Sequence, residues 1–275
     1  MLRIGTCSWK YDSWRGLVYS GDPNVNYLEE YSQKYNTVEI DQWFWSLHDG
    51  GNVTLPKPNV VEEYLRSVPE DFKFSIKIPN SITLSHFYRK KKEDPLVSNP
   101  HFLSVDLFNK FLERIQPLEK NLGPLMFQFE YLNKQKMSSQ IEFLNKFETF
   151  ISRCPGDYLY GMEIRNPNYM NESYFRFLNH NHLYHVFLQG YYMPPIFKVY
   201  ERNASAIQNT VIIRLHGPDR KKIEEKSQGQ WNQIYEPRDD ELDSITPISI
   251  DLHETLSVSK DTVKTGFAKL RLVAS

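Results

Sequence analysis

Short apolar segments alternate with longer segments of helical periodicity along most of this 275-residue chain. The short segments predict β-strands, which in chain order are Arg3–Thr6, Thr37–Ile40, Phe72–Ile78, Pro124–Phe129, Leu159–Ile164, Tyr184–Leu188 and Thr210–Leu215. The longer segments predict helices, which are Tyr27–Tyr35, Asn59–Val68, Phe102–Leu118, Ser138–Ile151 and Glu172–Asn179. Strands that alternate with helices in this way are typical of βα units and a parallel sheet.

The remaining segments complete the predicted fold. Asn80–Pro100 and Tyr191–Pro195 predict irregular structure, whereas Ile248–His253 predicts an eighth strand and Thr262–Leu272 a last helix. No internal repeat or low-complexity linker interrupts the chain, so we expect a single domain over residues 1–275, although this length also admits two smaller domains. The predicted fold class is α/β, in the form of a TIM-like (β/α)8 barrel.

Polar side chains recur near the carboxyl ends of the predicted strands. Glu163 and Arg165 share one face of a strand, whereas Met162 and Ile164 share the other. The same alternation places polar residues on one face of further strands, and the full set is Glu39, Asp41, Lys77, Gln128, Glu163, Arg165, Arg214 and His216. In a barrel these side chains converge on one mouth, so we expect a hydrogen-bonded cluster of mixed charge.

A cluster of this kind has two interpretations. It can bind a small ligand and perform acid/base chemistry, with Glu163, Glu39 and His216 as the candidate catalytic residues. It can also be a structural polar plug, because charge networks that only stabilise the fold occur at the same places. We favour the functional site, since pockets at barrel mouths usually bind a ligand.

Composition and charge exclude several classes of protein. The net charge is −1, so no overall field attracts the chain to nucleic acid or to a membrane surface. Two cysteines are too few for a disulfide framework. The first residues lack the pattern of a signal peptide, and no apolar run approaches the ~20 residues that span a bilayer. We therefore expect a soluble protein of the cytoplasm.

Two local features leave other ligands open. Arg89–Asp94 reads RKKKED, and such a run can grip phosphates but is more often a solvated loop. The aromatic segment Cys7–Asp22, which contains Trp9, can form a lid or pocket wall, or it can cover one end of the core.

A metal site is not predicted. Glu39, Asp41, Glu163 and His216 offer oxygen and imidazole ligands that suit a divalent cation. However, the chain contains no HExxH motif and no paired-histidine spacing. We therefore predict no metal ligands and assign no cofactor.

Several segments between Ile4 and Gly217 occur in the order found in a known family, and they are IGTCSWKYDSWRGLVY, LEEYSQKYNTVEI, DFKFSIKIPNSIT, LGPLMFQFE, YGMEIRNPNY and RLHG. On these segments the chain resembles the YecE-like family, a domain of unknown function with a TIM-barrel fold. The resemblance implies a (β/α)8-type barrel with a polar pocket and implies no particular reaction. The pocket residues that it implies are Glu39, Lys77, Thr83, Gln128, Glu163, Arg165, Arg214 and His216.

The chain departs from the family pattern in two places. After the second predicted strand it reads DQWFW, where relatives often have a small or polar residue followed by an aromatic pair. The last family strand normally ends in paired asparagines that face the pocket, whereas no asparagine follows Asn232 here. Residues 241–275 therefore depart from the pattern, and we expect a barrel that is irregular or incomplete at its last βα unit.

Three functions remain open from the sequence. The first is binding or acid/base conversion of a small polar, anionic or sugar-like ligand, which would be bound by Lys77, Thr83, Gln128, Arg165, Arg214, Asp41 and Trp9. The second is binding of nucleic acid or another phosphodiester, with metal-assisted hydrolysis as a variant, although the charge balance does not favour it. The third is a ligand-binding scaffold without catalysis, because a barrel fold does not guarantee a reaction.

Overall fold

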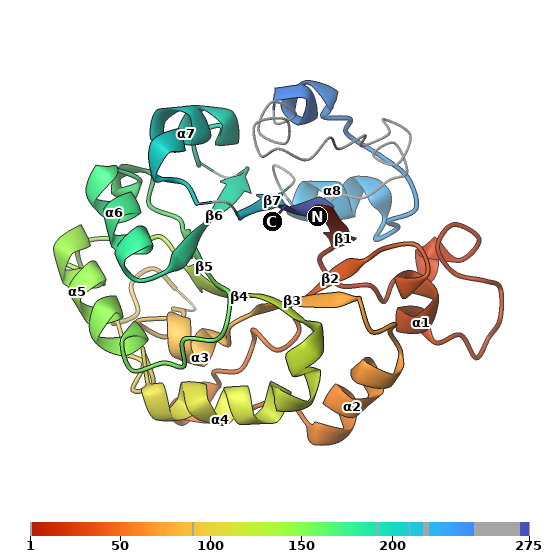
Figure 1. Ribbon diagram of the computed structural model, residues 1–275, viewed down its shortest axis with the longest axis horizontal. Helices are drawn as coiled ribbons and strands as arrows, with labels where there is room; N and C mark the ends of the chain where they lie inside the picture. The colour runs from red at the N-terminus through yellow and green to blue at the C-terminus, as the bar shows by residue number, and fades with distance from the viewer. Residues whose placement is uncertain are drawn as a thin grey trace.

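An 8-stranded sheet in the spatial order β1-β8-β7-β6-β5-β4-β3-β2 curls around the centre of the computed structural model (Figure 1). The strands are β1 Leu2–Thr6, β2 Thr37–Ile40, β3 Lys73–Lys77, β4 Leu122–Phe129, β5 Tyr160–Ile164, β6 Leu183–Gln189, β7 Val211–Leu215 and β8 Leu270–Ala274. The structure describes residues 2–89, 91–190, 192–208, 210–216, 220–244 and 270–274, with only the backbone of Arg220 and of β8.

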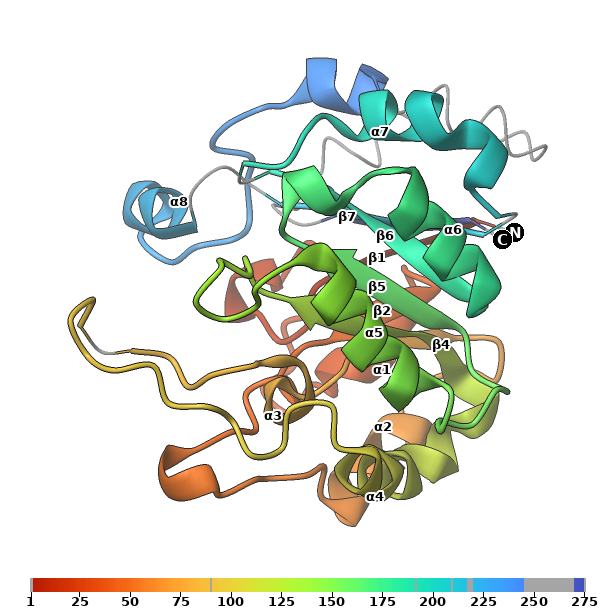
Figure 2. The same cartoon turned by 90° about the vertical axis from the view of Figure 1, so that its left-hand side faces the viewer.

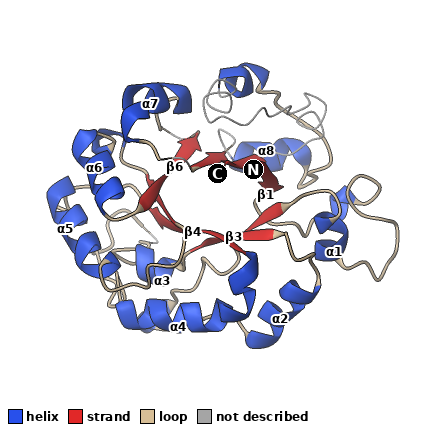
Figure 3. Cartoon of the chain, in the orientation of Figure 1, coloured by secondary structure: helices blue, strands red, loops and turns tan. Residues whose placement is uncertain are grey.

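Helices surround the sheet on its outer side (Figure 3). They are α1 Tyr27–Ser32, α2 Pro58–Arg66, α3 Asn80–Thr83, α4 Val105–Ile115, α5 Gln140–Ile151, α6 Glu172–His180, α7 Ile196–Asn203 and α8 Arg220–Ser227. Short 3-10 helices are η1 Asp12–Trp14, η2 Asp49–Gly51, η3 Gln116–Asn121, η4 Pro167–Tyr169 and η5 Ala204–Ala206. Within the described ranges, no helix is both long and apolar enough to cross a membrane.

The α/β barrel that the sequence predicts is confirmed for the first seven strands. Every neighbouring pair from β2 to β7 is parallel, as βα units require. The predicted helices are also present, and polar caps explain where they begin. For example, the side chains of Asn26 and Ser104 accept hydrogen bonds from the first-turn amides of α1 and α4.

The carboxyl end of the chain differs from the predicted βα unit. The predicted helix Thr262–Leu272 is wrong at its end, because Leu270–Leu272 lies in β8, which pairs antiparallel with both β1 and β7. The predicted strand Ile248–His253 lies outside the described residues. Pairing with two open strand edges outweighs the local helical pattern. The expected irregularity at the last βα unit is therefore confirmed, and both chain ends lie together, with Leu2 opposite Ala274 (Figure 2).

The remaining gap in the ring is closed between β1 and β2. Cys7 and Glu39 form a parallel bridge, and the Ser8 amide donates to the Glu39 carbonyl at 3.0 Å. Below this bridge, the Tyr31 hydroxyl accepts from the Thr6 amide at 2.8 Å and donates to the Thr37 carbonyl at 3.1 Å. A buried side chain from α1 thus supplies the hydrogen bonds that the short strands do not make directly.

The interior of the barrel beneath the strand ends is apolar. Met126, Val186 and Ile212 form a buried cluster there, from β4, β6 and β7. Gly161 faces them, and a Cβ atom at this position would lie 2.8 Å from a Val186 methyl carbon. This packing fills the barrel below the polar residues, which lie towards the carboxyl ends of the strands.

The aromatic amino-terminal segment packs into the core. Trp9, Trp14 and Tyr19 are buried, and the Trp14 indole donates to the Trp231 carbonyl at 2.7 Å. The amide of Trp231 in turn donates to the Ser13 hydroxyl at 3.0 Å. Of the two interpretations of this segment, the contacts favour a cover over one end of the core.

Candidate functional site

The carboxyl ends of five strands place polar side chains inside the barrel mouth. These side chains belong to Glu39 of β2, Lys77 of β3, Gln128 of β4, Glu163 of β5 and Arg214 of β7. Each is buried. Strand alternation turns them inward, while neighbours such as Ile40 and Phe127 join the outer core. The predicted convergence of polar residues on one mouth is therefore observed.

Arg214 is the centre of this cluster. Its Nη1 donates to Gln128 Oε1 at 3.0 Å and also pairs with Glu163 Oε2, while its Nη2 donates to Glu39 Oε1 at 3.2 Å. Arg214 retains 2% of its exposure, and both glutamates are buried. One guanidinium from β7 thus joins β2, β4 and β5 across the barrel, which suits the planar fork of its five donors.

Glu163 is held between two guanidinium groups. Arg165 Nε lies 3.1 Å from Glu163 Oε1, while Arg214 contacts the other carboxylate oxygen. Burial by itself would raise the pKa of Glu163, but Arg214, then Arg165 and His216, outweigh it and lower the pKa to about 2. Glu163 is therefore ionised throughout the physiological pH range.

This depressed pKa predicts a loss of stability in acid. The ordinary pKa of the carboxyl is 4.5, so the stabilisation by Glu163 is complete above that value and disappears as the pH falls towards about 2. Protonation over this window is expected to remove about 3 kcal/mol of unfolding free energy. Urea unfolding of the wild type at a series of pH values between 6 and 2 measures this loss. The same series is measured for Glu163→Gln.

The control for this prediction is Glu172→Gln, which removes an exposed carboxylate 3.6 Å from Arg176 on α6. The unfolding free energy of that variant should depend on pH as it does in the wild type, because exposed pairs contribute little to stability. The unfolding free energy of Glu163→Gln should depend on pH less than that of either protein. Parallel curves for all three proteins would show that Glu163 does not carry the acid sensitivity.

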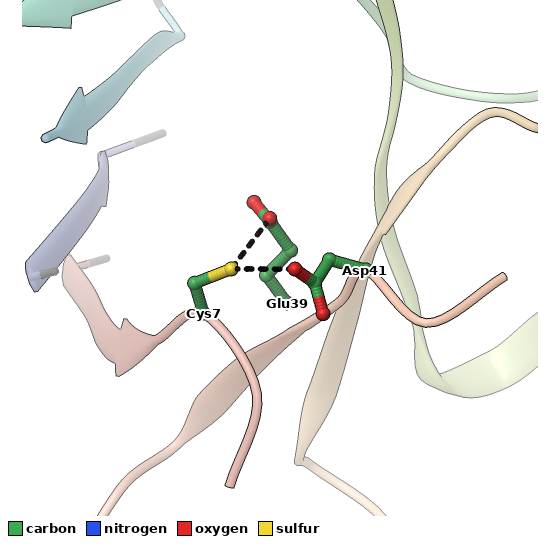
Figure 4. Close-up of side chains that lie close together, drawn as sticks. All are labelled: Cys7, Glu39 and Asp41. Atoms are coloured by element: carbon green, nitrogen blue, oxygen red, sulfur yellow. Dashed lines mark hydrogen bonds between the residues drawn. The ribbon is translucent and has the colours of Figure 1, made fainter. Parts of the chain in front are cut away.

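Cys7 joins the cluster, although the sequence did not single it out. Its Sγ lies 3.1 Å from Glu39 Oε1 and 3.3 Å from Asp41 Oδ2, so the single thiol proton is shared between the two carboxylates (Figure 4). The signal was present, because Cys7 follows the first strand just as Asp41 follows the second. The other site residues share this position near the carboxyl end of a strand.

Cys7, Glu39 and Asp41 are also the residues that could hold a metal ion. One ligand atom from each lies within 4.8 Å of the others. A cation there would require loss of the thiol proton, and it would meet the guanidinium of Arg214 on the same Glu39 oxygen. Of the oxygen ligands considered from the sequence, Glu39 and Asp41 belong to this group. Glu163 does not, because it pairs with Arg165 and Arg214.

Lys77 differs from the other charged residues of the mouth. It retains 8% of its exposure, and its Nζ lies 4.0 Å from the centre of the Phe44 ring. Among the residues that the structure describes, none accepts a hydrogen bond from this ammonium or pairs with it. Burial, followed by the positive charge of Arg214, lowers the pKa of Lys77 from 10.5 to about 8, although Cys7, Asp41 and Glu163 oppose this.

The other predicted site residues lie in varied positions. Thr83 is buried at the end of α3, which follows β3 directly. His216 follows β7, where its amide donates to the Gln189 carbonyl at 2.9 Å, and its charge acts on Glu163. Trp9 packs its ring edge-on against Tyr64 of α2, with centroids 4.9 Å apart, so its described contacts lie in the core.

Phe44 was also missed as a candidate. Its ring carries the cation–π contact with Lys77, and its backbone carbonyl accepts from the Asn80 amide at 2.7 Å. Phe44 lies in the DQWFW segment that departs from the family pattern. The departure was visible in the sequence, but the contact with a residue of β3 was not.

The fold and the mouth define an α/β barrel protein with a charged site at the carboxyl ends of its strands. The sequence profile described as "Protein of unknown function DUF72" matches residues 3–253, so the chain belongs to the DUF72 family. Its resemblance to the YecE-like family is confirmed by the UPF0759 protein YecE of Escherichia coli (strain K12), which is 28% identical over 173 residues. That match covers 62% of this chain and 50% of the relative, so the chain spans about half the length of the curated relatives it matches.

Solved structures of the family have the same fold. A DUF72 family protein from Enterococcus faecalis V583 superimposes with a TM-score of 0.60 at 18% identity, covering 91% of this chain and 84% of that chain. A DUF72 family protein from Thermotoga maritima MSB8 superimposes with a TM-score of 0.56 at 20% identity, covering 90% of this chain and 86% of that chain. At these identities the likeness establishes the barrel fold alone.

Proposed function

We propose that the barrel mouth binds a small polar ligand through an anionic or carbonyl oxygen and acts on it by acid/base chemistry. The observation that carries this proposal is the ammonium of Lys77, a residue that retains 8% of its exposure and for which the described residues provide no acceptor. A buried charge without a partner costs several kcal/mol, so a site that keeps one is suited to a ligand that supplies the partner.

The neighbouring acids are already committed, which strengthens this argument. Glu163 is shared by two arginines, Glu39 receives Arg214 and Cys7, and Asp41 receives Cys7. Two further buried donors, the Thr83 hydroxyl and Arg214 Nε, have no hydrogen-bond partner in the part of the chain that the structure describes. Together with Lys77, these donors suit a ligand rich in oxygen, such as a carboxylate, a phosphate or a sugar acid.

The pKa values divide the roles within the site. A carboxylate with a pKa of about 2 is a weak base, so Glu163 chiefly holds Arg214 and Arg165 in place. Lys77, with a pKa lowered to about 8, exchanges its proton near physiological pH. Glu39 and His216 remain the proposed partners for proton transfer, since both lie at strand ends beside the cluster. A cytoplasmic location belongs with this proposal, because such ligands are abundant there.

Replacing Lys77 should abolish ligand binding without unfolding the barrel. A melting screen with inorganic phosphate, small carboxylates and sugar phosphates is expected to yield compounds that raise the Tm of the wild type by about 5 °C or more at a hundred times Kd. Lys77→Met should lose the shift, because the ligand loses its cationic partner. Lys73→Met is the matched control on the same strand, since Lys73 contacts the Lys120 carbonyl outside the mouth. Equal shifts in all three proteins would contradict the proposal.

One observation favours nucleic acid as the second candidate. Trp45 and Tyr88 are 61% and 52% exposed, with ring centroids 6.0 Å apart, beside the basic segment that begins at Arg89. Exposed aromatic rings next to bases suit the stacking of a single strand. Arg89 Nη1, however, donates to the Lys92 carbonyl at 2.7 Å, within its own loop. The same melting measurement with a single-stranded oligonucleotide tests this candidate. A rise in Tm that is retained in Lys77→Met would support it.

A further inference from the structure

We propose that Lys77 forms a covalent imine with the carbonyl carbon of its ligand, so that the substrate class is a small aldehyde, ketone or oxo acid. This inference rests on the proposed function of the barrel mouth and deepens it. The amine of Lys77 is then the catalytic nucleophile, and the other charged residues of the mouth prepare its surroundings.

The surroundings of Lys77 are those of a nucleophile more than those of a structural cation. The ammonium lies 4.0 Å from the centre of the Phe44 ring, on a residue that retains 8% of its exposure. Lys136, which is also largely buried with 13% side-chain exposure, shows the contrast, because its Nζ lies 2.6 Å from Glu130 Oε2. The described residues provide no such carboxylate for Lys77, and a lysine that is desolvated beside another cation gives up its proton readily.

Arg214 and Lys77 are both buried in the mouth, and the acceptor groups are divided unequally between them. Arg214 takes Gln128, Glu39 and Glu163, while Lys77 receives no direct acceptor from the described residues. A guanidinium keeps its proton in proteins, but an ammonium can lose one. The groups that act electrostatically on Lys77 are Arg214, Cys7, Asp41 and Glu163, and burial with Arg214 outweighs the others to give a pKa of about 8.

The covalent step is balanced without an oxidant or a reductant. Lys77 first loses one ammonium proton, and the nitrogen lone pair then forms a bond with the carbonyl carbon while the π electrons move to oxygen. The two remaining N–H hydrogens pass to that oxygen, which leaves as water, and a C=N bond remains. Asp41, which follows β2 and whose charge acts on Lys77, is suited to relay these protons.

The test is reductive trapping of the wild-type protein. The chain is incubated separately with pyruvate, glycolaldehyde and dihydroxyacetone phosphate in the presence of cyanoborohydride, which reduces an imine to a stable secondary amine. Peptide mapping then compares adducts at Lys77 and Lys73 of the same molecules, so the result does not depend on a variant that folds. At neutral pH, adducts at Lys77 should form at least about tenfold faster than at Lys73, because the lowered pKa of Lys77 leaves part of its amine unprotonated.

The pH profile provides a second readout. Adduct formation at Lys77 should rise with pH, reach half of its maximum near pH 8 and level off above it. Lys77→Arg keeps the positive charge and should form no adduct at position 77. Preferential trapping at Lys77 with this profile supports the inference.

Three outcomes would overturn the imine. Equal trapping at Lys77 and Lys73 would show only ordinary amine reactivity. Carbonyl probes that raise the Tm through Lys77 without forming an adduct would leave the binding function standing and remove the covalent step. If phosphate, the carboxylates and the carbonyl probes all fail to shift the Tm and no adduct forms, the proposed function fails together with the inference.

Discussion

Replacement of Arg214 by methionine is expected to lower the free energy of unfolding by about 3–5 kcal/mol, the cost of breaking a buried ion cluster from one side. Methionine keeps most of the volume but removes the charge that joins Glu39, Gln128 and Glu163. Both glutamates would then be buried with one fewer cation, and the pKa of Glu163 would rise. Urea unfolding at neutral pH measures the loss, and a milder loss in weak acid is expected as the carboxyls protonate.

Two further proteins make this prediction specific. Arg176→Met removes an exposed arginine from a 3.6 Å pair with Glu172, and it should cost about 0.5 kcal/mol or less. Arg214→Met combined with Glu39→Gln and Glu163→Gln should recover part of the stability, since the uncompensated charges are removed as well. If Arg214→Met alone is as stable as Arg176→Met, the cluster does not hold the barrel mouth together.

The second large effect is expected for Gly5→Ala. A Cβ atom at Gly5 would lie 1.9 Å from the Thr37 carbonyl oxygen, which is a backbone atom that cannot rotate away. Strands β1 and β2 would have to separate at the point where the ring closes. We expect a loss of about 3 kcal/mol of unfolding free energy, at the upper end of the cost of overpacking. Thermal and urea unfolding of the variant measure it.

Gly156→Ala is the control for this change. A Cβ atom there meets nothing within 4 Å, so the variant should unfold as the wild type does. Gly5→Ala should also weaken ligand binding at the mouth, because Cys7 lies two residues further along and bridges to Glu39. If Gly5→Ala is as stable as the wild type, the Gly5 backbone does not lie this close to the Thr37 carbonyl.

The sequence predicted the fold where apolar periodicity and strand alternation act locally. The strands from β1 to β7 and the helices α1, α2, α4, α5 and α6 were all expected within a few residues. The helix α8 was missed because its sequence, RKKIEEKS, has a single apolar residue and no stripe to detect. The helix α3 was missed because four residues are too few to show a period.

The site was predicted in its membership but not in its connections. Alternation along each strand is a local property, so Glu39, Lys77, Gln128, Glu163 and Arg214 could be assigned to one face without any knowledge of their partners. Which acid meets which base depends on distances across the barrel. Arg214 meets Glu39 from a position 175 residues further along the chain, and no local pattern contains that information.

By itself, then, the sequence determined that a barrel mouth would be charged, because the inward positions at the strand ends are polar. The tertiary structure decided that Arg214 pairs with Glu39 and Glu163 and that Lys77 lies against Phe44, since only barrel closure brings these groups within contact distance. It also decided that the carboxyl-terminal residues Leu270–Ala274 form an antiparallel strand. Hydrogen bonding to β1 and β7 is a long-range interaction that outweighs the helical preference of that segment.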